Sequence, residues 1–185
     1  MQAGADGHFA APRLTDGVLL LDGYLREDVD AHLKGEDEET ARRFGWYPQR
    51  SSVDTVRGAI ERWQENWRTG GSRRAWAVRD PETGRLLGGC EVRLKGSGVA
   101  EMSCWTGHED RGRGVASRAA RLVCDYAFHE LGVARVEVLV EPDNLASRRV
   151  AEKAGFVQEG ILRDVAQVGD ERRDMVLYSR LPADP

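Results

Sequence analysis

The sequence has no hydrophobic run that approaches the roughly 18 residues of a membrane-spanning helix. Its first residues, Met1 to Asp6, lack the charged and apolar regions of a signal peptide. The formal net charge is only −4, so charge gives no indication of a nucleic acid or a membrane surface as a partner. We therefore expect a cytoplasmic protein that binds neither nucleic acid nor membrane.

Cysteine and histidine are also scarce. Cys90, Cys104 and Cys124 are odd in number and lack metal-site spacing, and we expect all three to be reduced thiols in the core. The four histidines form no pair at the spacing of metal ligands, so we predict no metal site.

The composition is typical of one globular domain. The chain has 185 residues, of which 41% are hydrophobic and 31% are charged, which suffices for a sizeable core. Residues 1–11 are small and polar and are predicted to be disordered, and residues 12–182 are predicted to form a single domain.

Hydrophobic periodicity predicts helices and strands in mixed order. The clearest helix follows Ser51 and Ser52, two candidate N-caps, and its apolar residues recur at steps of three and four. Three strands with tight links come next, which indicates an antiparallel meander. The predicted strands are 18–22, 74–79, 86–94, 99–106, 135–140, 156–167 and 171–180, and the predicted helices are 26–34, 37–44, 53–69, 113–130 and 144–154.

One stretch has the composition of an anion site. A strand leads into a glycine-bearing turn and a helix start, which read Arg111, Gly112, Arg113, Gly114, Val115 and Ala116. The first turn of a helix has free backbone N–H groups and partial positive charge, and glycines let the backbone approach a phosphate. The Walker pattern is absent, and Ser117 stands where the dinucleotide fingerprint needs a third glycine. We interpret the turn as a pyrophosphate cradle.

The wider window from Cys104 to Ala116 resembles the Gcn5-related N-acetyltransferase (GNAT) family, whose acyl-CoA loop reads Arg/Gln-x-x-Gly-x-Gly/Ala. A second segment, from Asn144 to Phe156, is similar to the family's Asn-x-x-Ser…Lys-x-Gly-Phe pattern. The continuation from Glu159 to Arg163 looks most like the RimJ/RimL-like branch of ribosomal-protein alanine and serine N-terminal acetyltransferases. The resemblance is clear from about Arg74 to the end and looser between Leu14 and Thr69.

The resemblance implies an α/β fold with a mostly antiparallel mixed sheet of about seven strands and about four flanking helices. The sheet would splay at the acyl-CoA site. Acetyl-CoA would be the acyl donor, with its pyrophosphate on the Arg111–Ala116 loop. Its pantetheine arm would pair with the main chain of Cys104, Trp105 and Thr106 and meet the Asn144 side chain, which could equally be only a helix cap.

The resemblance also places Ser147 near the thioester sulfur. The general base is open: Glu101 is the first candidate, Asp174 the second and His108 the third, and Glu101 could equally be a surface ion-pair partner. The acceptor would be a protein or peptide N-terminal amine, with small-molecule amines and a non-catalytic CoA-binding module as alternatives. The aromatic turn at 44–48 would plug a corner of the core or form a wall of the acceptor pocket. A homodimer is compatible with the resemblance.

Overall fold

The computed structural model describes residues 10–44, 49–168 and 171–184. Most of the predicted disordered segment therefore lies outside the described residues, as do four of the five residues of the aromatic turn and the tip of the last hairpin. Ala11 is half-buried and packs against the core.

The described residues form one eight-stranded sheet flanked by five α-helices, which confirms the predicted fold class. The sheet order is β1-β2-β3-β4-β5-β6-β8-β7, and β5 with β6 is its parallel pair. The predicted meander is β3, β4 and β5. The elements are β1 (Leu14–Thr15), β2 (Leu20–Asp22), α1 (Asp28–Gly35), α2 (Glu38–Arg43), α3 (Val53–Thr69), β3 (Arg73–Arg79), β4 (Leu86–Gly96), β5 (Val99–Thr106), the 3₁₀ turn His108–Asp110, α4 (Val115–His129), β6 (Arg135–Val140), α5 (Leu145–Lys153), β7 (Val157–Val168) and β8 (Glu171–Arg180).

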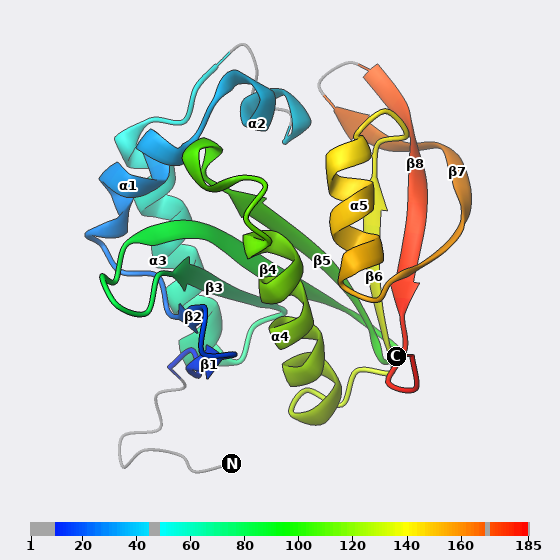
Figure 1. The fold of residues 1–185 in the computed structure, drawn as a ribbon, viewed down its shortest axis with the longest axis horizontal. Helices are drawn as coiled ribbons and strands as arrows, with labels where there is room; N and C mark the ends of the chain where they lie inside the picture. The colour runs from blue at the N-terminus through cyan, green and yellow to red at the C-terminus, as the bar shows by residue number, and fades with distance from the viewer. Residues whose placement is uncertain (1–9, 45–48, 169–170, 185) are drawn as a thin grey trace.

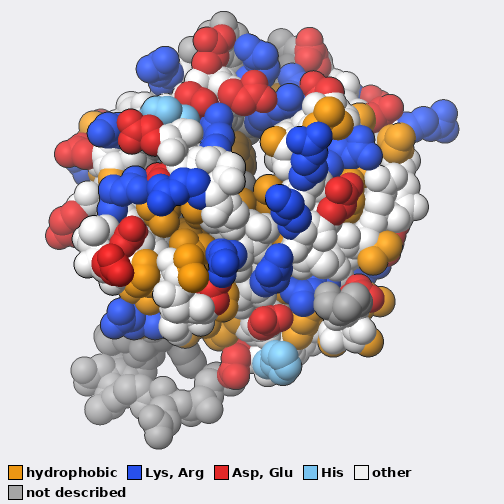
Figure 2. Space-filling view, in the orientation of Figure 1, with side chains coloured by type: hydrophobic (Ala, Val, Ile, Leu, Met, Phe, Trp, Pro, Cys, Tyr) orange, Lys and Arg blue, Asp and Glu red, His pale blue; other side chains and the backbone are white. Residues whose placement is uncertain are grey.

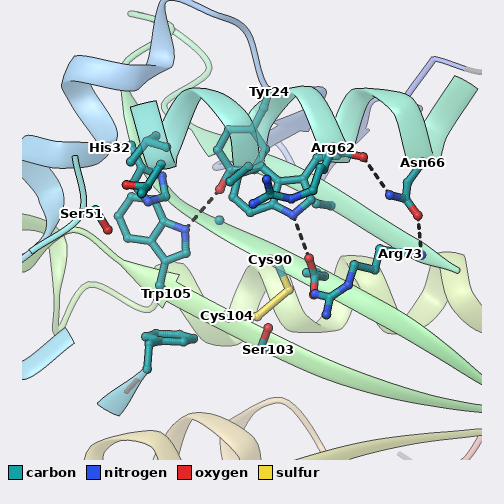
Figure 3. Close-up of a pocket in the computed structure, with 18 of the residues that line it drawn as sticks. Tyr24, His32, Ser51, Arg62, Asn66, Arg73, Cys90, Ser103, Cys104 and Trp105 are labelled. Carbon is teal, nitrogen blue, oxygen red and sulfur yellow. Dashed lines mark hydrogen bonds and ion pairs between the residues drawn. A yellow bond between two sulfur atoms is a disulfide. The ribbon is translucent and has the colours of Figure 1, made fainter. Parts of the chain in front are cut away.

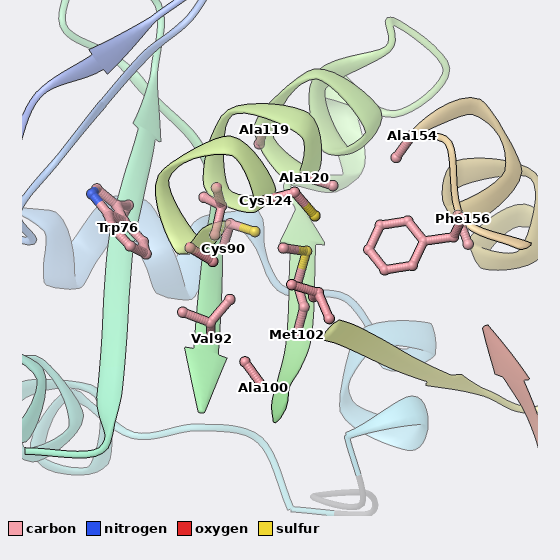
Figure 4. Packing of buried hydrophobic residues seen from close by; sticks show 14 of the residues in the cluster. Trp76, Cys90, Val92, Ala100, Met102, Ala119, Ala120, Cys124, Ala154 and Phe156 are labelled. Atoms are coloured by element: carbon pink, nitrogen blue, oxygen red, sulfur yellow. The ribbon is translucent and has the colours of Figure 1, made fainter. Parts of the chain in front are cut away.

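Helices cover both faces of the meander (Figure 1). On one face Cys90, Val92 and Met102 pack under α4 in the main core, where Figure 4 shows them close to Ala120 and Cys124. On the other face lie α1 and α3, with a smaller apolar cluster around Ile60. Successive side chains of β4 therefore point alternately into the main core and toward the opposite face of the sheet. The pocket described below lies on that opposite face.

Helix α3 begins and ends as the sequence predicts. The Ser52 hydroxyl accepts from the Thr55 amide, and the Ser52 amide donates to the Thr55 hydroxyl, which completes a capping box. Gly70 ends the helix in the left-handed region, with φ +73°. Trp67 donates its indole N–H to the Ala75 carbonyl at 2.8 Å, which fixes α3 on β3.

The sheet opens between β5 and β6. These strands pair over three residues, and the last pair is Glu101 with Glu137. Beyond that pair the two strands diverge toward the end of the molecule that carries α2 (Figure 1). Strand β6 continues on its other side with β8, and α5 lies beside it. This opening is the splay that the sequence analysis expected.

Candidate functional site

The glycine-bearing loop has an open backbone. Gly112 and Gly114 have φ +77° and +81°, a region in which a Cβ is strained, and α4 starts directly afterwards at Val115. A Cβ on Gly112 would meet no atom within 4 Å. The first-turn N–H groups of α4 have no carbonyl of their own helix to bind. The loop therefore presents free donors and the positive end of a helix dipole to open space, as an anionic ligand requires.

The buried carboxylate of Asp110 holds this loop in place. Arg85 donates two hydrogen bonds to it, at 2.7 and 2.8 Å, and Arg113 donates a third at 2.9 Å. The Arg85 hydrogen bonds, opposed in part by burial, lower the pKa of Asp110 below its ordinary value. Arg113 is held by this single bond and its side chain is 65% exposed, so it can reach toward a ligand.

Arg111 has different partners from those expected of a phosphate ligand. Its guanidinium donates to both carboxylate oxygens of Asp37, at 2.7 and 2.8 Å, and to the Thr40 hydroxyl at 2.8 Å. Asp37 is the N-cap of α2 and Thr40 lies in the first turn of that helix. The loop is therefore tied to α2 through Arg111.

The opening between β5 and β6 exposes one edge of β5. Cys104, Trp105 and Thr106 pair with β4 on one side and lie beyond the last pair with β6 on the other. Their main-chain groups on that second side are available to an extended ligand, as expected for a pantetheine arm. The structure thus brings the β5 edge and the glycine loop together at one end of the sheet.

Asn144 and Ser147 lie across this opening, at the start of α5. The Asn144 carboxamide oxygen accepts from the Ser147 amide at 3.1 Å, so Asn144 is the N-cap of the helix. This contact fixes both residues at the helix start, and Ser147 is half-buried. The capping role of Asn144 is present, and a contact of Asn144 with pantetheine stays a prediction.

A pocket of about 700 Å³ lies on the face of the meander that α1 and α3 cover (Figure 3). Aromatic rings form much of its wall. The Tyr24 and Trp63 rings stack at 4.5 Å between centroids, and the His32 and Trp105 rings lie 4.4 Å apart. Trp105 donates its indole N–H to the Tyr24 hydroxyl at 3.2 Å. Because Trp105 is also part of the exposed β5 edge, the pocket and the opening adjoin at this residue.

The polar groups of the pocket centre on Glu91. Its carboxylate accepts from the Trp63 indole N–H at 2.9 Å and from Arg73 at 2.5 Å. Burial raises the pKa of Tyr24, so the phenol stays protonated at neutral pH. Nδ1 of His32 is buried and has no hydrogen-bond partner among the described residues. Aromatic faces and a carboxylate together suit a cationic amine.

The three candidate bases lie apart from this pocket lining. Glu101 accepts from Arg93 at 2.8 Å and from Lys95 at 3.3 Å, in a cluster at the start of the opening. Asp174 accepts from the Asp164 amide in the β7–β8 hairpin. His108 is exposed, and its Nε2 lies 3.9 Å from Oε1 of Glu109. Glu91 is the carboxylate that faces the pocket, and the sequence analysis did not single it out.

Two of the three cysteines differ from the expectation. Cys90 and Cys104 are joined as a disulfide, so the prediction of three reduced thiols is wrong for this pair. Their positions face each other directly in the β4–β5 register, with a Cα–Cα distance of 4.2 Å. That register is a tertiary property, which the count and spacing of cysteines did not show. Cys124 is free, and burial raises the pKa of its thiol to about 12.

A sequence signal for the pocket existed in the pair Gly88 and Gly89. A Cβ on Gly89 would overlap the Tyr24 hydroxyl, and one on Gly88 would overlap the main chain of Trp105. Glycines inside a strand indicate the close approach of another group. The pair in β4 therefore marked a strand that Tyr24 and Trp105 approach closely.

A known protein-family model matches a region of the chain that includes both the glycine loop and the start of α5. The model of the acetyltransferase (GNAT) domain matches residues 19–157, most of the chain. The chain belongs to the GNAT acetyltransferase family. This family assignment confirms the resemblance that the loop and the Asn144–Phe156 segment indicated.

Curated relatives of this GNAT protein match over part of their length. It is 47% identical over 73 residues to the probable N-acetyltransferase YjcK of Bacillus subtilis, which is 40% of each chain. It is 39% identical over 82 residues to the putative ribosomal N-acetyltransferase YdaF of the same organism, which is 44% of this chain and 45% of that one. The aligned region thus spans less than half of these relatives.

Solved structures share the whole fold. The ribosomal L7/L12 α-N-protein acetyltransferase RimL, solved in complex with coenzyme A, superposes with a TM-score of 0.80 at 16% identity. The superposition covers 92% of this chain and 98% of RimL. At this identity the likeness shows the shared fold, and the RimJ/RimL-like branch is supported by the sequence similarity to YdaF and to the ribosomal-protein-serine acetyltransferase of Escherichia coli, which is 28% identical over 83 residues.

No helix among the described residues is both long and apolar enough to cross a membrane. No group of three or more His, Cys, Asp and Glu side chains within residues 10–44, 49–168 and 171–184 is placed to hold a metal ion.

Proposed function

We propose that this protein is an acetyl-CoA-dependent N-acetyltransferase. The observation that carries the proposal is the meeting of two features at one end of the sheet. One is the open glycine backbone at the start of α4, and the other is the β5 edge that β6 leaves unpaired. The first suits a pyrophosphate and the second an extended arm, which are the two parts of CoA that a protein must hold.

The chain's own groups would hold the cofactor as follows. The Gly112–Ala116 backbone and the exposed side chain of Arg113 would bind the pyrophosphate. The main chain of Cys104, Trp105 and Thr106 pairs with the arm. When bound, acetyl-CoA supplies an activated thioester carbonyl. A backbone N–H at Cys104 or Trp105 stabilises the charge that develops on the carbonyl oxygen, and losing such a donor costs roughly 3 kcal/mol in other enzymes.

The acceptor amine enters from the aromatic pocket, on the side of β5 where Trp105 lies. The deprotonated amine nitrogen would bond to the thioester carbon while the carbon–sulfur bond breaks, and the proton that the nitrogen then loses would pass to the departing thiolate, which yields an amide and a thiol. A thiol pKa of about 8.5 makes the thiolate an adequate leaving group, and the Ser147 hydroxyl is our candidate for passing a proton to it. Glu91 recognises the cationic acceptor. The base stays open: Glu101 is our first candidate, but it is paired with Arg93 and Lys95 apart from the pocket lining.

We propose a protein or peptide N-terminal amine as the acceptor. The ribosomal acceptors in the names of YdaF and RimL support this choice for related proteins. Small amines are the alternative, because one relative at 30% identity over 42% of this chain is a spermidine N(1)-acetyltransferase. Arg62 and Arg73 in the lining support the peptide, because they would repel a polycation more strongly than a peptide N-terminus with a single ammonium charge.

The test is thiol release from acetyl-CoA in the presence of peptides that begin with alanine or serine, with spermidine in a parallel assay. We expect release with the peptides and a mass increase of one acetyl group at their N-termini. Thiol release with spermidine and not with the peptides would show that the acceptor is a small amine and not a peptide N-terminus. Binding of acetyl-CoA without release on any amine would make the protein a CoA-binding module.

A further inference from the structure

Helix α2 is anchored on both sides of the opening between β5 and β6. Its N-terminal end is bound to the glycine loop through Asp37 and Arg111. Its C-terminal end is bound to the segment after β6 through Arg43, which pairs with Glu141 and Asp143. Figure 1 shows α2 beyond the diverging ends of the two strands. The helix thus bridges the two halves of the sheet at the candidate site.

Of the two loop arginines, Arg111 is held by more hydrogen bonds than Arg113. Arg111 donates three hydrogen bonds, two of them to one carboxylate in parallel, whereas Arg113 donates one. Asp37 also accepts from the Thr40 amide at 2.9 Å, so the same carboxylate caps α2 and binds the loop. Moving Arg111 onto a ligand would break all three bonds, and moving Arg113 would break one bond to a carboxylate that Arg85 already satisfies.

The C-terminal anchor is built around a buried charge. Glu141 is 7% exposed and accepts from Arg43 of α2 and from Arg173 of β8. The Asp143 hydrogen bond is the main cause that raises the pKa of Arg43 above its ordinary value, so this guanidinium stays charged. A buried carboxylate between two guanidiniums holds its partners firmly, because removing one leaves the charge poorly compensated. The position of α2 therefore depends on both anchors.

Helix α2 lies in the chain between two parts of the pocket wall. His32 of α1 precedes it, and Phe44, its C-cap residue, follows it, and both line the pocket. Charged side chains of both signs are interspersed over the face that carries α4 and α5 (Figure 2). Fixing α2 thus fixes this part of the acceptor wall.

We infer that Arg111 is a positioning residue, which holds α2 and so the acceptor wall, and does not bind the cofactor's phosphates. The inference rests on the proposed function, and it revises the expectation from the sequence that Arg111 belongs to the pyrophosphate cradle. The pyrophosphate then depends on the loop backbone and Arg113. Through its bonds to Asp37, Arg111 fixes α2, and with it part of the acceptor pocket, relative to the glycine loop. The two residues act as one unit, so their substitutions should not be additive.

The variants follow from the geometry. Asp37→Asn keeps an oxygen to cap α2 but removes the carboxylate charge. Arg111→Ala removes the other partner, and Arg111→Lys keeps the charge but loses the parallel donors. Asp16→Asn is the matched control, because Asp16 also caps backbone amides and pairs with one arginine, Arg118, away from α2.

The first measurement is hydrogen exchange of α2, residues 38–44, in the free protein. We expect faster exchange in Arg111→Ala and in Asp37→Asn by a similar factor, no further increase in the double variant, an intermediate value in Arg111→Lys and no change in Asp16→Asn. Unchanged α2 exchange in either single variant, or additive increases in the double variant, would overturn the coupling. This measurement needs no ligand, so its result remains valid even if the proposed function is wrong.

The second measurement is the acetyl-CoA dissociation constant by calorimetry. We expect Arg111→Ala and Asp37→Asn to stay within fivefold of the wild type and Arg113→Ala to lose more. A loss above fivefold in Arg111→Ala would overturn the assignment, since removing a charge-assisted hydrogen bond to phosphate costs about tenfold or more. Absence of binding by the wild type would contradict the proposed function and leave the exchange result to decide the role of Arg111.

Discussion

The Trp63 indole N–H donates a hydrogen bond to Glu91 at 2.9 Å, and this contact joins helix α3 to strand β4 inside the aromatic pocket. Arg73 approaches the same carboxylate from β3 at 2.5 Å. The Glu91 carboxylate is therefore held in a fixed orientation by two neighbouring elements. A fixed carboxylate among aromatic rings can select a cationic amine by position as well as by charge.

Trp63→Phe tests this contact, because it keeps a ring in the wall and removes only the indole N–H. We expect a loss of about 0.5–1.5 kcal/mol in unfolding free energy and a several-fold rise in the KM of a peptide acceptor. Trp67→Phe is the control, since Trp67 also donates its N–H, to Ala75, but belongs to the main core. A KM that rises equally in both variants would show that the effect is one of stability.

Gly114→Val tests the pyrophosphate cradle. The new side chain would project from the residue before α4, where the free N–H groups lie, and we expect acetyl-CoA affinity to fall at least tenfold. The positive φ adds a strain of about 1–2 kcal/mol. Gly132→Val has the same kind of backbone strain at the other end of α4, with φ +65° and open space around it. Equal acetyl-CoA affinities in the two variants would remove the cradle from the account.

The sequence predicted the local structure of this segment well, because strand, turn and helix start depend on local signals. The positive-φ glycines, the start of α4 and strand β5 all follow from neighbouring residues, and β5 has the predicted bounds. The acceptor side depends on contacts between distant residues. Glu91 meets Trp63 across 28 positions, and Arg111 meets Asp37 across 74. Such pairs, like the Cys90–Cys104 register, are set by packing and have no local pattern.

Ser147→Ala separates catalysis from binding. If the hydroxyl protonates the leaving thiolate, kcat should fall by roughly tenfold to a hundredfold while acetyl-CoA affinity changes little. The α5 cap should survive, because it uses the Ser147 amide and the Asn144 side chain. Steady-state kinetics with a peptide acceptor and calorimetry provide the two numbers. A parallel loss in both, or no loss, would make Ser147 a packing residue.

Asp110→Asn tests the support of the loop through pH. The Arg85 hydrogen bonds depress the folded-state pKa of Asp110 below 3.8, so the ion pairs stabilise the fold at pH 7 and lose their contribution as pH falls through that lower value. We expect the unfolding free energy of the variant to be lower than that of the wild type by about 1–3 kcal/mol at pH 7. This difference in unfolding free energy should narrow below pH 3.8. Thermal melts across this range measure it.

The control for that series is Asp54→Asn, whose carboxylate is 89% exposed and pairs with Arg57 on the surface of α3. Exposed pairs of this kind contribute little. A gap for Asp110→Asn that stays constant down to pH 3 would show that the side chain acts by packing and not by charge.

The most direct test of the central claim is a thermal melt with and without acetyl-CoA, with NADH and ATP as controls. A ligand at about 100 times its dissociation constant adds roughly 2.7 kcal/mol to the native state. For a chain of this length that is a rise of about 5–10 °C in Tm. We predict this rise with acetyl-CoA alone. A folded protein whose Tm does not respond to acetyl-CoA would contradict the account.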